Sequence, residues 1–144
     1  MTGSRAVGSS GALLGAFALL MAACAPTPYR PQTLEGGYAD TRVNVDTFNV
    51  VFQGNAQTSR QTAETYALYR CAELTVESGF DYFVLIGGNA EALYGGKPGG
   101  TAASSGGKNP SVVVLFKAFK GEKPSGAVFN ARDVLRELGP SIVR

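Results

Sequence analysis

The clearest alternation of apolar and polar side chains lies in residues 48–53. Side chains of an extended chain point to opposite faces in turn, so every second residue shares a face. This segment therefore predicts a strand with one buried face, and Gly54 begins the turn that ends it. A short strand is expected before it, over residues 38–45. The residues of the apolar face are Phe48, Val50 and Phe52.

Apolar residues then recur at helical spacing up to Gly79, which is a suitable residue just past the end of a helix. Thr58 or Ser59 could cap its start. One stripe of small or apolar residues would let the helix lie close to a sheet; it consists of Ala63, Ala67, Cys71 and Leu74. A second stripe, on roughly the opposite side, consists of Tyr69, Ala72 and Val76. A helix on an isolated sheet needs one apolar face, so the second stripe packs under the Gly-rich loop or the C-terminal tail, or it is a candidate partner surface.

Two further strands are expected towards the C-terminal end. Residues 80–86 carry apolar side chains on both faces, which is typical of a strand inside a sheet, and residues 111–119 contain a second, continuously apolar run. Residues 87–110 between them are rich in Gly, Ser and Ala and predict a flexible loop. Asn130 is expected to cap a short helix that docks on the sheet. The docking residues would be Val134, Leu135 and Leu138.

The order of these elements is strand, strand, helix, strand, loop, strand and short helix, which indicates an α+β fold. A mostly antiparallel sheet of about four strands accommodates this order, with one long helix packed on one face and a short C-terminal helix. The strand–helix–strand crossover should be right-handed if its two strands are parallel. Residues 37–144 then form one domain, because their number suits a single hydrophobic core.

The apolar run before Cys24 has a different character and predicts an export signal over residues 1–23. Arg5 supplies a weakly positive start. The apolar core leads into Met21-Ala22-Ala23-Cys24, which has the form of a bacterial lipobox with Met21 where Leu is usual. In a lipobox the thiol of Cys24 receives diacylglycerol, the chain is cleaved between Ala23 and Cys24, and the new amine is acylated, for example with palmitate. The three acyl chains that result anchor a protein stably to a membrane.

Two other interpretations of this segment stay open. Ala23-Cys24-Ala25 also fits an ordinary A-x-A cleavage site, and cleavage after Ala25 would release a soluble secreted protein. An uncleaved segment would have to span a membrane, for which it is short, because a span needs about 20 apolar residues. No Asp follows Cys24, which by the usual Gram-negative sorting logic favours the outer membrane, with the domain on the periplasmic side.

Residues 24–36 are expected to connect the lipid to the domain. The stretch after Cys24 contains three prolines and little to bury, so it predicts an extended tether. Pro28 and Pro31 also fit the Pro-x-x-Pro spacing of proline-recognition ligands. A plain spacer is the simpler interpretation of this composition.

The composition of the chain excludes several classes of function. The chain contains 13 Lys and Arg against 11 Asp and Glu without blocks of like charge, so it has no electrostatic footprint for nucleic acid. It contains no His, which excludes Ser-His and Cys-His catalysis and removes the commonest metal ligand. If Cys24 carries lipid, Cys71 has no disulfide partner and is expected to be a buried, inert thiol.

The remaining candidates for a reactive site are weak. Gly96-Lys97 and Gly107-Lys108 lack the Ser or Thr and the earlier Gly that a phosphate-binding loop needs. Glu73 and Glu77 lie one helical turn apart with Arg70 close by, which predicts a solvated ion-pair face rather than an acid–base pair. We therefore expect no enzymatic activity, no catalytic residue, no cofactor and no metal site.

Several stretches after Cys24 are distinctive as a set: residues 37–40, 51–55 with 58–59, 66–75, 79–83, 130–135 and 138–140. Together they resemble a family of small proteobacterial outer-membrane lipoproteins without an assigned activity. The chain departs from the family at Cys71, where a small apolar residue is expected, and in the loop after Ile86. The resemblance implies export, lipidation and one domain, and it offers no catalytic residue to carry over.

The sequence thus predicts a lipid-anchored protein of the cell envelope whose domain binds or scaffolds another envelope component. The alternative is a sensor or accessory subunit of an envelope complex that uses the surface of Tyr69, Ala72 and Val76. A soluble secreted protein and an enzyme with an unrecognised site are the remaining hypotheses. The expected partners are the membrane, through the lipid, and an envelope protein.

Overall fold

The computed structural model describes residues 25–89 and 109–144. It is an α+β fold in which every neighbouring pair of strands is antiparallel, as predicted, but the sheet has five strands in the order β1-β2-β4-β3-β5. The predicted signal segment, Cys24 and most of the predicted Gly-rich loop lie outside the described residues. The elements are β1 (Gly37–Arg42), β2 (Thr47–Gln53), α1 (Arg60–Glu77), β3 (Tyr82–Gly88), β4 (Ser111–Phe119), β5 (Phe129–Asn130), α2 (Ala131–Leu138) and a short 3₁₀ helix, η3 (Gly139–Ser141).

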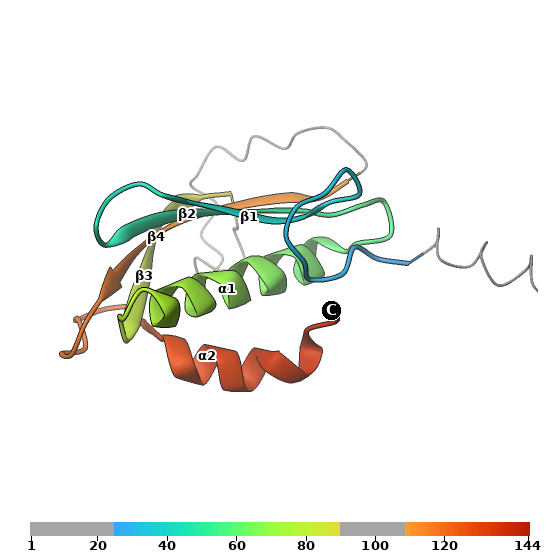
Figure 1. Ribbon diagram of the computed structural model, residues 1–144. Helices are drawn as coiled ribbons and strands as arrows, with labels where there is room; N and C mark the ends of the chain where they lie inside the picture. The colour runs from blue at the N-terminus through green and yellow to red at the C-terminus, as the bar shows by residue number, and fades with distance from the viewer. Residues whose placement is uncertain (1–24, 90–108) are drawn as a thin grey trace, which may run out of the picture.

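Three layers make up the domain (Figure 1): the sheet, then α1, then α2 on the far side of α1. Because α1 lies between two layers, it needs apolar residues on both sides. The four residues of its predicted sheet-facing stripe are all buried: Ala63, Ala67, Cys71 and Leu74. The expectation that the short C-terminal helix docks on the sheet is wrong, since α2 packs mainly on α1.

The central strand of the sheet is β4, which pairs with β2 on one side and with β3 on the other. Buried and partly exposed residues alternate along β2, which confirms the predicted alternation, and they also alternate along β4, whose sequence is continuously apolar. The fully buried aromatic and branched side chains of these two strands form the middle of the core: Val50, Phe52, Val112, Val114 and Phe116.

The third strand lies inside the sheet, as predicted, because β3 has β4 on one side and β5 on the other. Its pairing with β5 involves its first two residues, Tyr82 and Phe83. Its pairing with β4 shifts between Leu85 and Gly87, and Ile86 at this irregularity is 52% exposed. The predicted loop is shorter at its first end, because β3 includes Gly87 and Gly88, whereas β4 begins at Ser111 as predicted.

Both ends of α1 follow the capping rules used to predict them. Ser59 is the N-cap, and its hydroxyl accepts the N–H of Thr62 at 3.0 Å. At the other end the N–H of Gly79 donates to the Val76 carbonyl and the N–H of Phe80 donates to the Thr75 carbonyl. This pair of bonds is a Schellman motif, and it needs the positive φ of Gly79. The helix is therefore defined by its own local sequence.

The short helix α2 also begins where its sequence predicts. The side chain of Asn130 accepts the N–H groups of Arg132 and Asp133. Two of its residues, Ala131 and Val134, are buried in the same core as α1. Asn130 also belongs to β5, so one residue ends the sheet and starts the helix that crosses to the far side of α1.

Candidate functional site

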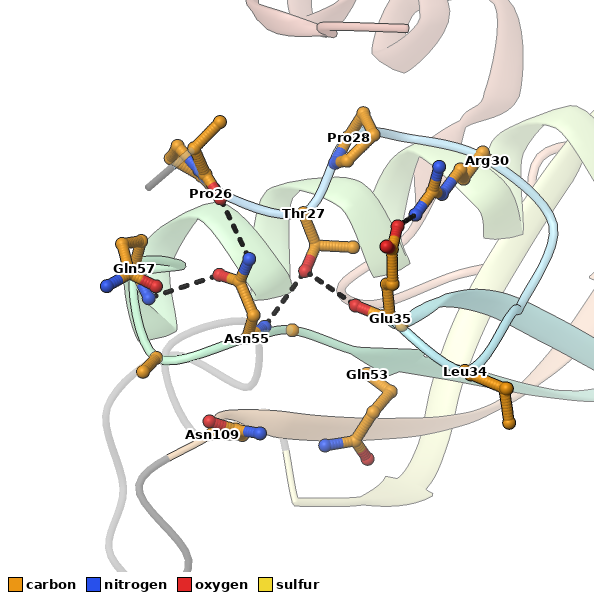
Figure 2. Close-up of a pocket in the computed structure, with 14 residues that line it drawn as sticks. Pro26, Thr27, Pro28, Arg30, Leu34, Glu35, Gln53, Asn55, Gln57 and Asn109 are labelled. Atoms are coloured by element: carbon orange, nitrogen blue, oxygen red, sulfur yellow. Dashed lines mark hydrogen bonds and ion pairs between the residues drawn. The ribbon is translucent and has the colours of Figure 1, made fainter. Parts of the chain in front are cut away.

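A groove with a volume of about 800 Å³ opens at the end of the sheet where β2 leads towards α1 (Figure 2). Residues 25–36, which we call the N-terminal segment, supply one wall. The end of β2 and the loop before α1 supply the other. Four of the lining side chains are carboxamides, so we call this feature the amide-rich groove: Gln53, Asn55, Gln57 and Asn109.

Thr27 joins the N-terminal segment to the loop before α1. Its backbone N–H donates to the hydroxyl of Thr58 at 2.9 Å, and its own hydroxyl donates to the Glu35 carbonyl at 3.3 Å. The same hydroxyl accepts the N–H of Asn55 at 2.9 Å, and the side chain of Asn55 donates to the Ala25 carbonyl at 2.8 Å. Since Thr27 is only 2% exposed, the loss of its hydroxyl would leave buried polar groups without partners.

Two glycines let the walls of the groove approach each other. Gly36 has a φ of +108°, and a Cβ atom at this position would lie 2.3 Å from the carbonyl oxygen of Gln53. A Cβ atom on Gly54 would lie 2.7 Å from the Cβ of Thr58. Both distances are shorter than real Cβ contacts, so these positions require glycine.

The amide-rich groove offers hydrogen-bonding groups rather than reactive ones. Its carboxamides can each donate and accept hydrogen bonds. Among the described residues that line it, only Arg30 and Glu35 are ionisable, and they form an ion pair at 2.5 Å. The Nε atom of Arg30 is buried without a partner among the described residues. Such a lining suits a neutral polar ligand and supplies no nucleophile with an adjacent base.

Tyr29 carries the N-terminal segment into the hydrophobic core. It is 4% exposed, its N–H donates to the Val143 carbonyl at 2.7 Å, and its hydroxyl donates to the Glu73 carboxylate. Burial, together with the neighbouring Glu73 carboxylate, raises the pKa of the Tyr29 hydroxyl well above its ordinary value. The ring packs within 5.7 Å, between centroids, of three other tyrosines: Tyr38, Tyr66 and Tyr69.

Arg70 is the centre of a charged cluster on the adjoining surface. Its guanidinium contacts the carboxylates of Asp40 at 2.9 Å, Glu73 at 3.0 Å and Glu77 at 3.3 Å. Burial disfavours the charge of Arg70, but its hydrogen bonds to Asp40 and Glu73 outweigh burial and raise the pKa of the guanidinium. The predicted ion-pair face of Glu73 and Glu77 is therefore confirmed, although the Glu73 side chain is only 18% exposed.

The carboxylates of Glu73 and Glu77, considered above as an acid–base pair, and that of Asp81 lie away from the amide-rich groove. Glu73, Glu77 and Asp81 are absent from its lining. Asp81 instead accepts hydrogen bonds from Arg132 at 2.8 Å and from the Gly121 N–H at 2.9 Å, and these bonds hold the pKa of its carboxyl below the ordinary value. The groove and the acidic side chains therefore do not form one site.

Cys71 is fully buried in the middle of α1 and forms no disulfide among the described residues. Burial raises the pKa of its thiol, so the nucleophilic thiolate is disfavoured. These observations agree with the prediction of a buried, inert thiol.

The second stripe of α1 is not the exposed partner surface considered from the sequence. Ala72 is fully buried, Tyr69 is 9% exposed, and Val76 packs partly buried against the core. The physical reason is the third layer, since α1 has α2 on its far side and Tyr29 against Tyr69 at 5.3 Å between ring centroids. The stripe is part of the hydrophobic core.

The interpretation of residues 24–36 as an extended tether is wrong for residues 25–36. Thr27 and Tyr29 are buried in the domain, and residues 30–33 pair with the start of β1 through the bridge between Pro31 and Tyr38. Sequence reasoning missed these residues because prolines dominate the segment. Tyr29, a large aromatic residue in an otherwise polar stretch, was the available signal.

Neither a membrane span nor a metal centre is found in the part of the chain that the structure describes. No helix there is long and apolar enough to cross a membrane. Within residues 25–89 and 109–144, no group of His, Cys, Asp or Glu could hold a metal ion. No family model, curated protein or solved structure matches this chain.

Proposed function

We propose that this protein is a lipid-anchored component of the bacterial cell envelope, held at the periplasmic side of the outer membrane through Cys24, with a binding or scaffolding role. The lipobox at residues 21–24 supports the anchor. The observation that carries the proposal is the way the first described residues join the domain. The Ala25 carbonyl is bound by the side chain of Asn55, and Thr27 and Tyr29 are buried.

The hydrogen bond that holds Ala25 to the domain changes what an anchor at Cys24 would do. A Pro-rich spacer would let the domain move freely above a membrane. Here Ala25, the residue after Cys24, is already bonded to the folded domain, so a lipid on Cys24 holds the domain directly at the membrane surface. Consecutive Cα atoms are about 3.8 Å apart, which leaves no length of chain for a spacer.

The amide-rich groove is the binding site that we assign to this role. It lies beside Ala25, and its carboxamides can pair with the amide or hydroxyl groups of a neutral ligand. Binding rather than catalysis fits its lining, since its ionisable side chains, Arg30 and Glu35, already pair with each other. An envelope component with exposed amide or hydroxyl groups is the class of ligand that this lining suits.

Replacement of Cys24 tests the anchor. In cells fed a radiolabelled fatty acid, we expect the full-length chain to be labelled and to sediment with the membranes. The Cys24→Ala variant should lose the label and move to the soluble fraction, because no other signal replaces the acyl chains.

The matched control is Cys71→Ala, which removes the other cysteine of the chain from the middle of α1. This variant should keep both the label and the membrane location. Retention of label and sedimentation by Cys24→Ala would rule out the proposed anchor.

A further inference from the structure

Leu34 is an apolar side chain where a turn normally carries a polar one. Thr33 and Gly36 exchange two backbone hydrogen bonds, at 3.0 and 3.2 Å, so Leu34 and Glu35 form the tip of a tight turn. Leu34 is fully exposed, with a relative exposure of 107%. Turn tips favour Gly, Pro, Asn, Asp and Ser, and a local departure from such rules often marks a functional position.

The place of this turn relative to the chain entry is the second observation. Leu34 and Ala25 both line the amide-rich groove, so the turn tip and the first described residue lie at the same end of the domain. Cys24, the residue that would carry the lipid, comes directly before Ala25 in the chain, which sets their Cα atoms about 3.8 Å apart. A bilayer that holds the lipid of Cys24 is therefore close to this end.

The charge at this end does not oppose a membrane. Among the described residues that line the groove, the ionisable ones are Arg30 and Glu35, and their ion pair leaves no net charge. The carboxamides around them are polar but neutral. A neutral polar surface with one projecting apolar side chain is compatible with the headgroup region of a bilayer, even where the lipids are anionic.

We infer that the groove end of the domain rests on the bilayer and that Leu34 inserts into it as a second contact beside the lipid. The inference deepens the proposed function, on which it rests. The anchor and the turn tip are then two contacts with one surface, and both place the groove end of the domain towards the membrane. The amide-rich groove then opens at the level of the lipid headgroups.

A fluorescent probe on an engineered thiol tests this orientation. The lipid occupies the thiol of Cys24 and Cys71 is buried, so a thiol introduced by Leu34→Cys is the one that reacts with an environment-sensitive probe such as NBD. The matched control is Val45→Cys. Val45 is also exposed, at 71%, but it lies in the turn between β1 and β2, at the far end of that hairpin from Gly36 and Gln53.

The lipidated variants are purified and reconstituted into vesicles of phosphatidylethanolamine and phosphatidylglycerol. We expect the emission of the probe at position 34 to shift to shorter wavelength and to be quenched by spin-labelled lipids, while the probe at position 45 stays in water. Water-like, unquenched emission at both positions in acylated, vesicle-bound protein overturns the inference alone. Absence of acylation overturns the proposed anchor, and the inference with it.

Discussion

At the scale of single residues, Arg70 joins elements that the sequence keeps apart. It bonds to Asp40 in β1 and to Glu73 and Glu77 in its own helix, and its guanidinium lies 4.7 Å from the centroid of the Tyr38 ring. The side chain of Arg70 is only 13% exposed. A charge with so little exposure to water is stable only beside opposite charges. The carboxylates around Arg70 in turn need its positive charge.

Replacement of Arg70 with Met tests this dependence. The hydrophobic stem is kept, but Asp40 loses its counter-charge and Glu73 keeps only its pair with Arg144. We expect the free energy of unfolding, measured by urea denaturation, to fall by about 2 kcal/mol. The matched control is Arg136→Met, which removes the exposed pair with Asp133 and should cost less than about 0.5 kcal/mol. Equal losses in the two variants would show that Arg70 acts as an ordinary surface charge.

At the scale of elements, the N-terminal segment behaves as a structural element without being a helix or a strand. It is held by Thr27 and Tyr29 on one side and by the bridge between Pro31 and Tyr38 on the other. Its turn closes against the end of β2, and only a glycine at position 36 permits that approach. The geometry of the groove wall therefore depends on a backbone contact rather than on a side chain.

A Gly36→Ala substitution is expected to break this contact. The new Cβ would meet the Gln53 carbonyl oxygen at 2.3 Å, and the positive φ adds strain, so the free energy of unfolding should fall by about 3 kcal/mol. Gly121→Ala is the control, since its φ of +77° is also positive but nothing lies within 4 Å of its Cβ position. It should cost about 1 kcal/mol. Denaturation curves that coincide for the two variants would contradict a steric role for Gly36.

The sequence pattern was sufficient to predict the elements that are determined by residues close together in the chain. The alternation at Phe48, Val50 and Phe52 and the caps of α1 at Ser59 and Gly79 arise within a few residues of sequence, and the structure confirms them. The two residues of β5 are too few to create a period, so that strand was missed.

The features that escaped prediction depend on distant partners. The apolar side of α2 suits a sheet or a helix equally well, so its sequence did not reveal that it packs on α1. Most of the candidate groove was missed for the same reason. The partners of Thr27 and Tyr29 include Thr58 and Val143, which no local composition around residue 27 could reveal.

At the scale of the whole molecule, two buried groups make the free energy of unfolding depend on pH in the alkaline range. The pKa values of Cys71 and Tyr29 are both raised in the fold, from ordinary values of 9.0 and 10.0. Their neutral forms are therefore favoured in the folded state. The stability they contribute is complete below those ordinary values and is lost as the pH rises above them, because the unfolded chain releases its protons first.

We therefore expect the free energy of unfolding to fall above about pH 9, with a slope of up to about 1.4 kcal/mol per pH unit for each group that has titrated in the unfolded chain. Urea denaturation at about pH 8 and about pH 10.5 measures the fall. A Tyr29→Phe, Cys71→Ala double variant should be less stable at the lower pH but lose less on going to the higher one. If the double variant loses as much unfolding free energy between the two pH values as the unaltered protein does, Cys71 and Tyr29 are not the cause of the loss.

The hydrogen bond from the N–H of Tyr29 to the carbonyl of Val143 has a consequence for the order of events in the cell. During export in the proposed route, the residues next to Cys24 cross the membrane well before residue 143. Tyr29 cannot reach the Val143 carbonyl until the chain up to that residue has been translocated. The acylating and cleaving enzymes of that route would therefore act before this hydrogen bond closes the domain.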